Sequence, residues 1–259
     1  MNSRPETPPA REISRISPYL RGQLFLFDRP MLPGYSSSQG YKLLAVFLVL
    51  EAIVRPLLKY GARAMGITHR DWWSLLQLSF LLVLACWLVT RLAGVRLSEL
   101  GLYPWRRWAL TEKLYFPQIL GITVAVFTVT QWGELKALRT RSDLGRIGLF
   151  VFVPQMIWGL YQEFVYRGIL QTELVRRCGA RLGILLSNLI FTFGPLHYYH
   201  FAAARDHAGH LWVFAAIFAI GLYFAMLFHR SGNMWIVGTL HGLGDSFIDG
   251  LGQVSRMVS

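Results

Sequence analysis

The sequence predicts an all-α fold, a polytopic transmembrane helical bundle of about seven or eight helices. Two observations predict it. The chain is 54% hydrophobic and only 15% charged, with a mean hydropathy of +0.39, which is too apolar for an ordinary soluble domain. In addition, about seven apolar runs approach the roughly 20 residues that a helix needs to cross a hydrocarbon core. We therefore expect a multi-pass protein of a cell membrane.

The apolar runs follow a polar N-terminal segment. Residues 1–41 are rich in proline and are expected to form a partly ordered cytoplasmic segment, whereas residues 42–259 form the transmembrane domain. The first run is interrupted by Glu51 and Arg55, which are four residues apart and are expected to pair on one helix face. The spans are predicted at 42–60, 73–92, 114–132, 146–170, 183–199, 211–229 and 233–250.

The positive charge of the chain is spread over short connectors between the apolar runs. A net charge of +12 can indicate nucleic-acid binding, but here the Lys and Arg residues form no contiguous stripe, so anionic lipid headgroups are the expected partner. Their distribution over alternate connectors favours a cytoplasmic N-terminus, and the Arg- and Trp-rich composition favours a bacterial inner membrane. The sequence does not indicate an oligomeric state.

Charged residues occur in the middle of the fourth run. Glu163 and Arg167 share one helix face, yet each costs roughly 2.5 to 3.5 kcal/mol to insert into a bilayer interior. Two explanations stay open at this point: a structural ion pair that locks helices together, or a catalytic role.

Two histidines add polar groups to two further runs. His197 lies in the fifth predicted span, at a distance from the Gly179 turn that matches that of Glu163. His241 and Asp245 are four residues apart on the last span, where the carboxylate can hold the imidazole ring. We therefore expect these three helices to bring their polar side chains to one site.

Such a set of side chains is suited to peptide hydrolysis without a covalent intermediate. A carboxylate and a histidine can activate water, while a second histidine donates a hydrogen bond to the oxyanion. Glu163, His197 and His241 could alternatively form a His-His-carboxylate metal set, although no His-Glu-x-x-His motif is present. The expectation is an enzyme that needs no cofactor and no metal.

Three motifs in order resemble the CPBP (Abi) family of intramembrane glutamic endopeptidases, which includes the CAAX prenyl endopeptidases. The family's Glu-Glu-x-x-x-Arg is similar to the stretch from Gln162 to Arg167, Phe-x-x-x-His to that from Phe193 to His197, and His-x-x-x-Asn/Asp to that from His241 to Asp245. The resemblance covers about 146–250. It implies that the last four helices form the catalytic core.

The resemblance also implies residue roles. Gln162 stands at the position of the water-activating base, Glu163 with Arg167 supports or substitutes for it, His197 contacts the water, and His241 with Asp245 forms the oxyanion site. The first motif departs from the family pattern, since Gln162 has an amide that cannot act as a base. Three explanations stay open: an engineered substitution that traps substrate, a natural inactive member, or Glu163 in the role of the base.

The expected activity is therefore cleavage of a peptide bond near the membrane anchor or C-terminal tail of a substrate protein. Prenylated C-termini, bacteriocin leaders and C-terminal sorting tails all fit, and the residues do not discriminate among them. The alternative is a catalytically inactive membrane scaffold or an immunity-type binding protein with the same fold.

Overall fold

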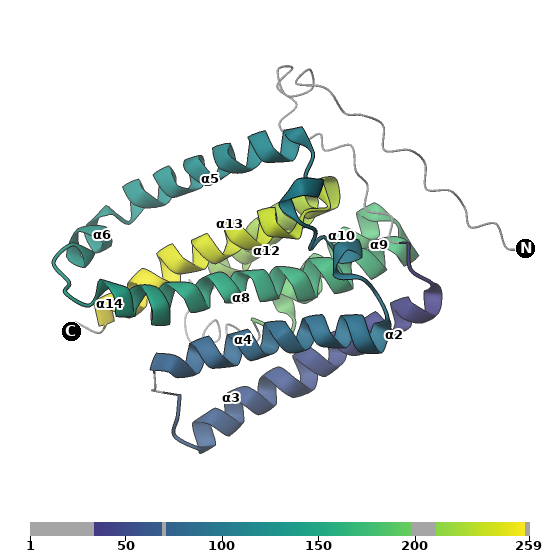
Figure 1. The fold of residues 1–259 in the computed structure, drawn as a ribbon, viewed down its shortest axis with the longest axis horizontal. Coiled ribbons are helices and arrows are strands. Elements are labelled where there is room, and N and C mark those ends of the chain that lie inside the picture. The colour runs from purple at the N-terminus through teal and green to yellow at the C-terminus, as the bar shows by residue number, and fades with distance from the viewer. Residues whose placement is uncertain (1–33, 69–70, 198–210, 257–259) are drawn as a thin grey trace, which may run out of the picture.

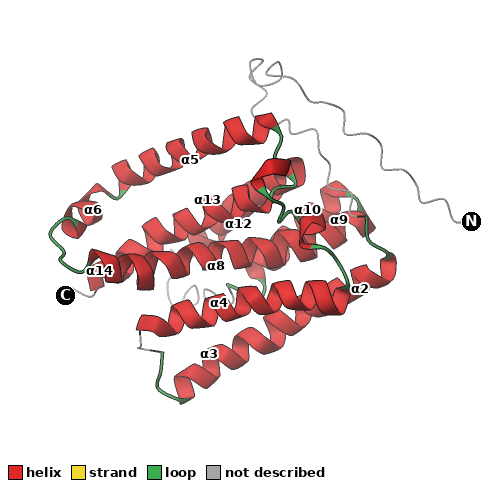
Figure 2. Ribbon diagram, in the orientation of Figure 1, coloured by secondary structure: helices red, strands yellow, loops and turns green. Residues whose placement is uncertain are grey.

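A computed structural model describes residues 34–68, 71–197 and 211–256 of the chain (Figure 1). Within these ranges the chain forms eight helices and no β-strand, so the predicted all-α fold is confirmed (Figure 2). The long helices run roughly side by side along the longest axis of the molecule (Figure 1).

The N-terminal half forms a helical hairpin followed by an outlying helix (Figure 1). Its first helix begins behind a capping box in which Ser36 and Gln39 satisfy each other's backbone N–H groups. The elements are α2 (Ser37–Leu48), η1 (Val49–Val54) and α3 (Arg55–Ala64) in one continuous helix, α4 (Asp71–Leu88) with η2 (Val89–Ala93), the short turns η3 (Leu97–Leu100) and η4 (Trp105–Arg107), then α5 (Leu110–Thr130) and α6 (Trp132–Leu138).

The C-terminal half contains the longest helix and the helices packed around it. Gly179, with a φ of 79°, breaks the chain between the longest helix and the next one. The elements are α7 (Leu144–Ile147), η5 (Gly148–Phe152), α8 (Val153–Glu163), η6 (Phe164–Gln171) and α9 (Thr172–Cys178) in one continuous helix, then α10 (Ala180–Phe193), α12 (Leu211–Ser231), and α13 (Met234–Asp245) continuing through η8 (Ser246–Gly250) into α14 (Leu251–Arg256).

Four of the described helices are long and apolar enough to cross a membrane: Trp72–Ala93, Leu110–Thr130, Leu144–Cys178 and Leu211–Ser231. The protein is accordingly a multi-pass membrane protein. The three other predicted spans are also helical, but α10 has only 14 residues, and the helices 37–64 and 234–256 are not among the four.

The prediction that the fifth span reaches residue 199 was wrong. Helix α10 ends at Phe193, and Gly194 and Pro195 follow. Proline has no backbone N–H to continue the helical hydrogen bonds, and it disfavours helical geometry in the residue before it. His197 consequently lies on the turn after α10 instead of on the helix.

Helix α8 occupies the centre of the bundle, between α13 and α4 (Figure 1). It approaches α13 very closely, because a Cβ atom placed on Gly159 would collide with the backbone of Gly242, and one on Gly242 would lie 2.7 Å from the Cα of Met156. Small residues that allow such backbone contact are typical of helix pairs in membranes.

Three buried carboxylates outside the candidate site fasten the outer helices to the bundle. Glu51 accepts hydrogen bonds from Arg55, as its spacing predicts, and also from the hydroxyls of Tyr161 (3.0 Å) and Tyr166 (2.8 Å). It therefore joins the first helix to α8 and η6.

Glu112 and Glu173 act in the same way at other helix ends. Glu112 accepts from Tyr103 (2.6 Å) and Asn233 (3.2 Å), so it ties the start of α5 to the start of α13. Glu173 pairs with Arg176 and accepts from Tyr35 at 3.1 Å. Burial and the Glu173 carboxylate raise the pKa of the Tyr35 phenol, which keeps it a donor.

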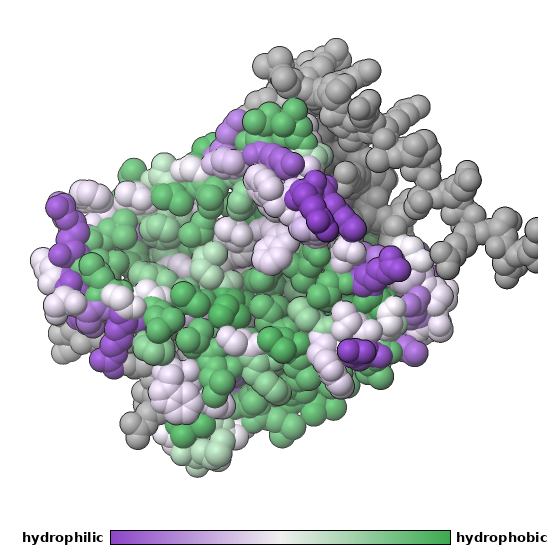
Figure 3. Space-filling model, in the orientation of Figure 1, coloured by the Kyte–Doolittle hydropathy of each residue, from purple (hydrophilic) through white to green (hydrophobic). Residues whose placement is uncertain are grey.

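The visible face of the molecule carries a broad apolar belt with polar residues gathered at its two ends (Figure 3). Large apolar side chains on the outer helices are exposed, among them Val83 at 67% and Val129 at 78%. An apolar belt that runs across the helices is expected where lipid tails surround the bundle.

Candidate active site

The candidate site is built where α8 passes into the π-helical segment η6. Glu163 is the last residue of α8, and Arg167 lies in the first turn and a half of η6. Both side chains have no exposed surface.

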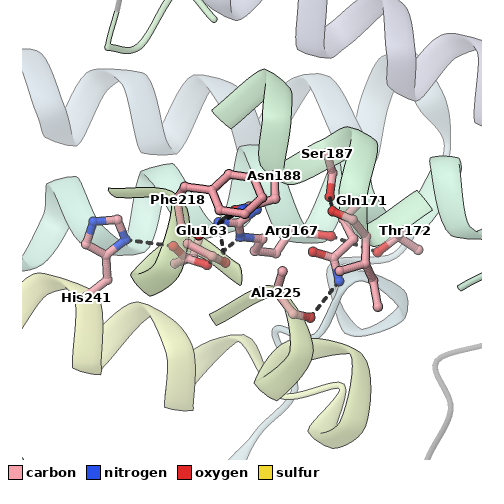
Figure 4. A network of polar contacts seen from close by, with 11 residues as sticks. Glu163, Arg167, Gln171, Thr172, Ser187, Asn188, Phe218, Ala225 and His241 are labelled. Atoms are coloured by element: carbon pink, nitrogen blue, oxygen red, sulfur yellow. Dashed lines mark hydrogen bonds and ion pairs between the residues drawn. The ribbon is translucent and has the colours of Figure 1, made fainter. Parts of the chain in front are cut away.

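Both carboxylate oxygens of Glu163 are engaged. Oε2 accepts a hydrogen bond from Arg167 Nε at 3.2 Å, and Oε1 accepts one from His241 Nδ1 at 2.7 Å (Figure 4). The predicted pair of Glu163 and Arg167 is therefore present, and it extends to a residue 78 positions away in the chain. A buried carboxylate with two such partners is held in a fixed position.

The guanidinium of Arg167 also contacts acceptors on two more helices through Nη2. Its Nη2 donates to the carbonyl of Gly221 on α12 at 2.9 Å and contacts Asn188 Oδ1 on α10 at 3.4 Å (Figure 4). Asn188 itself donates to the carbonyl of Phe218 at 2.9 Å. Arg167 thus connects the helix of the site with α10 and α12.

The ring of Phe191 lies close to Arg167 and to both histidines. Its centroid is 4.5 Å from Arg167 Cζ, 4.9 Å from the centroid of the His197 ring and 6.1 Å from that of His241. Phe193, the phenylalanine of the motif, is instead 44% exposed and stacks on Phe214. The buried ring in the site is therefore two residues earlier than the motif phenylalanine.

His197 has a defined tautomer when its ring is neutral. Nδ1 lies 2.8 Å from the carbonyl oxygen of Phe191, and a carbonyl can only accept, so Nδ1 carries the proton. Nε2 is then the basic nitrogen of the ring. A histidine oriented by a backbone carbonyl is suited to accept a proton or a hydrogen bond at Nε2.

A cavity of about 420 Å³ reaches His197 and Gln162. A volume of this size falls within the range typical of small-molecule and peptide-side-chain sites. The cavity is bordered by the first helix, α4, α8, the turn after α10 and the last helix, and its walls include Arg55, Lys59, Tyr60, Ser74, Gln77, Leu78, Leu81, Gln155, Trp158, Leu196, Asp249 and Gln253.

Gln162 and Asp245 contact each other beside this cavity. Gln162 Nε2 donates to Asp245 Oδ2 over a long 3.4 Å, and Asp245 Oδ1 lies 3.6 Å from His241 Nε2. Within the described part of the chain, Gln162 Oε1 is buried without a hydrogen-bond partner. His241 and Asp245 do not line the cavity; Gln162 and His197 do.

A scan against family models matches residues 145–247 to the family described as type II CAAX prenyl endopeptidase Rce1-like. Residues 145–247 are an Rce1-like domain. A search of curated proteins and a search of solved structures gave no match to the chain. The family of this domain implies an intramembrane protease that acts on protein substrates.

The Rce1-like domain contains every residue of the three sequence motifs. Its geometry brings Glu163, Arg167 and His241 into direct contact and places Asp245 against Gln162. His197 is linked to this group through Phe191 and shares the cavity with Gln162. Among the residues that the structure describes, no group of three His, Cys, Asp or Glu side chains could hold a metal ion, so the alternative metal set is not assembled.

The sequence analysis missed Asn188 and Phe191, which complete the surroundings of Arg167. Asn188 is fully buried, and an amide in the middle of an apolar run was a signal that could have singled it out. Phe191 gave no such signal, because an aromatic residue on an apolar helix is ordinary.

Proposed function

We propose that the protein is an intramembrane endopeptidase that hydrolyses a peptide bond near the membrane anchor or C-terminal tail of a substrate protein. The observation that carries this proposal is the cavity of about 420 Å³ that the Rce1-like domain forms with the first helix, α4 and the last helix, and whose walls include His197 and Gln162. A hydrolase needs such a place, where water, a basic nitrogen and a peptide carbonyl can meet away from bulk solvent.

Four of the candidate residues have a role in this proposal. His197 contacts the attacking water through Nε2, because Nδ1 is occupied by the Phe191 carbonyl. His241 acts in its doubly protonated form: Nδ1–H donates to Glu163, which holds the ring, and Nε2–H donates to the oxyanion of the tetrahedral intermediate. Arg167 fixes Glu163 and does not contact substrate.

The surroundings of the site support a substrate that arrives from the membrane. The cavity walls combine apolar side chains with Arg55 and Lys59 on the first helix. A peptide with a lipid-anchored or apolar tail would bring its scissile bond to this cavity while the tail stays in lipid. We propose that the N-terminal segment 1–41 is cytoplasmic and that the transmembrane domain 42–259 lies in a bacterial inner membrane.

A cleavage assay with the purified full chain in liposomes tests the proposal. The probes are two internally quenched peptides with the same Cys-aliphatic-aliphatic-X tail, one farnesylated on its cysteine and one not. We expect cleavage of at least one probe, and His197→Ala should reduce kcat/KM by about 10²- to 10⁴-fold. Undiminished cleavage by His197→Ala would remove this mechanism.

Gln162 is the observation that favours a second function, a catalytically inactive scaffold or immunity-type protein that binds a peptide without cleaving it. The amide offers no base at that position. This alternative predicts that the same probes bind, as measured by fluorescence anisotropy, and that neither the wild type nor Gln162→Glu cleaves them.

A further inference from the structure

We infer that Asp245 is the general base of the proposed peptidase, an inference that rests on the proposed function. The carboxylate that residue 162 lacks is present in the structure, on the neighbouring helix and in contact with the Gln162 side chain.

Gln162 itself is placed to bind the water and not to deprotonate it. Its side chain lines the cavity and is only 2% exposed, and its Oε1 has no partner among the described residues. Buried polar atoms are nearly always hydrogen-bonded, so this oxygen indicates a donor that enters from the cavity. Water is such a donor, and an amide oxygen accepts its hydrogen bond without taking the proton.

Glu163 is unsuited to replace the missing base. Its side chain has no exposed surface, and its two oxygens already accept from Arg167 and His241. A carboxylate that turned towards the cavity would leave the buried Arg167 without its counter-ion, which is strongly unfavourable.

Asp245 has the position that the role requires. Oδ2 is 3.4 Å from Gln162 Nε2, Oδ1 is 3.6 Å from His241 Nε2, and 19% of the side chain is exposed. Gln162 on α8 and Asp245 on α13 bring one amide and one carboxylate into contact. A carboxylate at residue 162 and an amide at residue 245 would bring the same two groups together. In this protein the carboxylate, and with it the base, is on α13.

The chemistry balances without any further reactant. Gln162 Oε1 accepts a hydrogen bond from the water, and Asp245 takes a proton as the water O–H bond breaks and the water oxygen bonds to the peptide carbonyl carbon. When the C–N bond then breaks, the proton passes to the leaving nitrogen and the Asp245 carboxylate is restored. One peptide bond and one water give a carboxylic acid and an amine.

The reciprocal exchange tests the inference. The purified full chain in liposomes is assayed with the farnesylated quenched peptide as the wild type, Asp245→Asn, Gln162→Glu, and the double variant Gln162→Glu/Asp245→Asn. We expect Asp245→Asn to lose about 10²- to 10⁴-fold in kcat/KM together with the acid limb of the pH–rate profile. The double variant should regain both, to within about tenfold of the wild type.

The other outcomes have separate meanings. Asp245→Asn with the wild-type rate, or a folded double variant as slow as Asp245→Asn, would overturn the inference. Asp249 is an exposed carboxylate that lines the cavity one turn further along the helix. A loss of cleavage in Asp249→Asn but not in Asp245→Asn would also overturn the inference. A silent wild type with an active Gln162→Glu would overturn this inference but keep the proposed function, whereas the absence of cleavage in every form would contradict the proposed function itself.

Discussion

Arg167 is the residue on which the candidate site depends most. It is completely buried, and its partners come from α8, α10 and α12. Its guanidinium also lies 4.5 Å from the centre of the Phe191 ring, a cation–π contact. One cation thus neutralises Glu163 and joins three helices.

Replacing Arg167 by Met should strongly destabilise the protein. The change removes the counter-ion and leaves a buried carboxylate, which costs about 3–5 kcal/mol. Denaturant unfolding in mixed micelles would measure the loss. The double variant Glu163→Gln/Arg167→Met should recover a large part of it, because no unpaired charge remains.

Arg141→Met is the matched control for this measurement. Arg141 pairs with Asp143 at the surface, where side-chain exposures are 24% and 34%, and exposed pairs contribute little to stability. If Arg167→Met were as harmless as Arg141→Met, the interpretation of Arg167 as the link between the helices would be wrong.

Spacing along the sequence predicted the ion pairs within one helix, but it did not predict the contacts that these residues make with other helices. The pairs Glu163–Arg167 and Glu51–Arg55 follow from a separation of four residues on one helix. The contact between Glu163 and His241 depends on how α13 packs against α8, which no local pattern contains. Spacing favoured Asp245 as the partner of His241, whereas Glu163 makes the shorter contact.

At the scale of elements, the crossing of α8 and α13 sets the geometry of the site. Gly159 and Gly242 meet at this crossing, three to four residues before Gln162 and Glu163 and within a turn of His241 and Asp245. The Glu163–His241 hydrogen bond of 2.7 Å therefore depends on an approach that only glycine permits.

Gly159→Ala should separate the two helices and weaken the site. The added methyl group would meet the backbone of Gly242, and overpacking of this kind costs about 1–3 kcal/mol. We expect a lower melting temperature in detergent together with reduced cleavage of the peptide probe.

Gly121→Ala provides the control on another membrane helix. Nothing lies within 4 Å of a Cβ atom at Gly121 on α5, so the change should be neutral or slightly stabilising through helix propensity. If Gly159→Ala and Gly121→Ala lowered the melting temperature and the cleavage rate equally, close packing of α8 against α13 would not be the reason for glycine at residue 159.

The ends of the elements were less predictable than their positions. Hydropathy located the helices, but the span that it predicted for α10 continues past the observed end at Phe193, because the residues that follow are largely apolar. Pro195 gave the local signal that ends this helix. The π-helical segment η6 had no recognisable signal in the sequence.

At the scale of the whole molecule, the apolar belt and the polar ends define a direction through the membrane (Figure 3). The helix 144–178 runs from one end of the molecule to the other (Figure 1). Its 35 residues exceed the roughly 20 needed to span a bilayer, so its two ends should protrude into opposite aqueous compartments.

Cysteine labelling of sealed membrane vesicles tests this topology. The native Cys178 is exposed at the C-terminal end of the long helix, and Ser142→Cys would place a thiol in the exposed connector before its N-terminal end. With Cys86 replaced by serine, an impermeant maleimide added outside should modify only one of the two positions in vesicles of a given orientation. Inverted vesicles should reverse the result. Modification of both positions from the same side would show that the long helix does not cross the membrane. The placement of Glu163 in the bilayer interior would then be wrong.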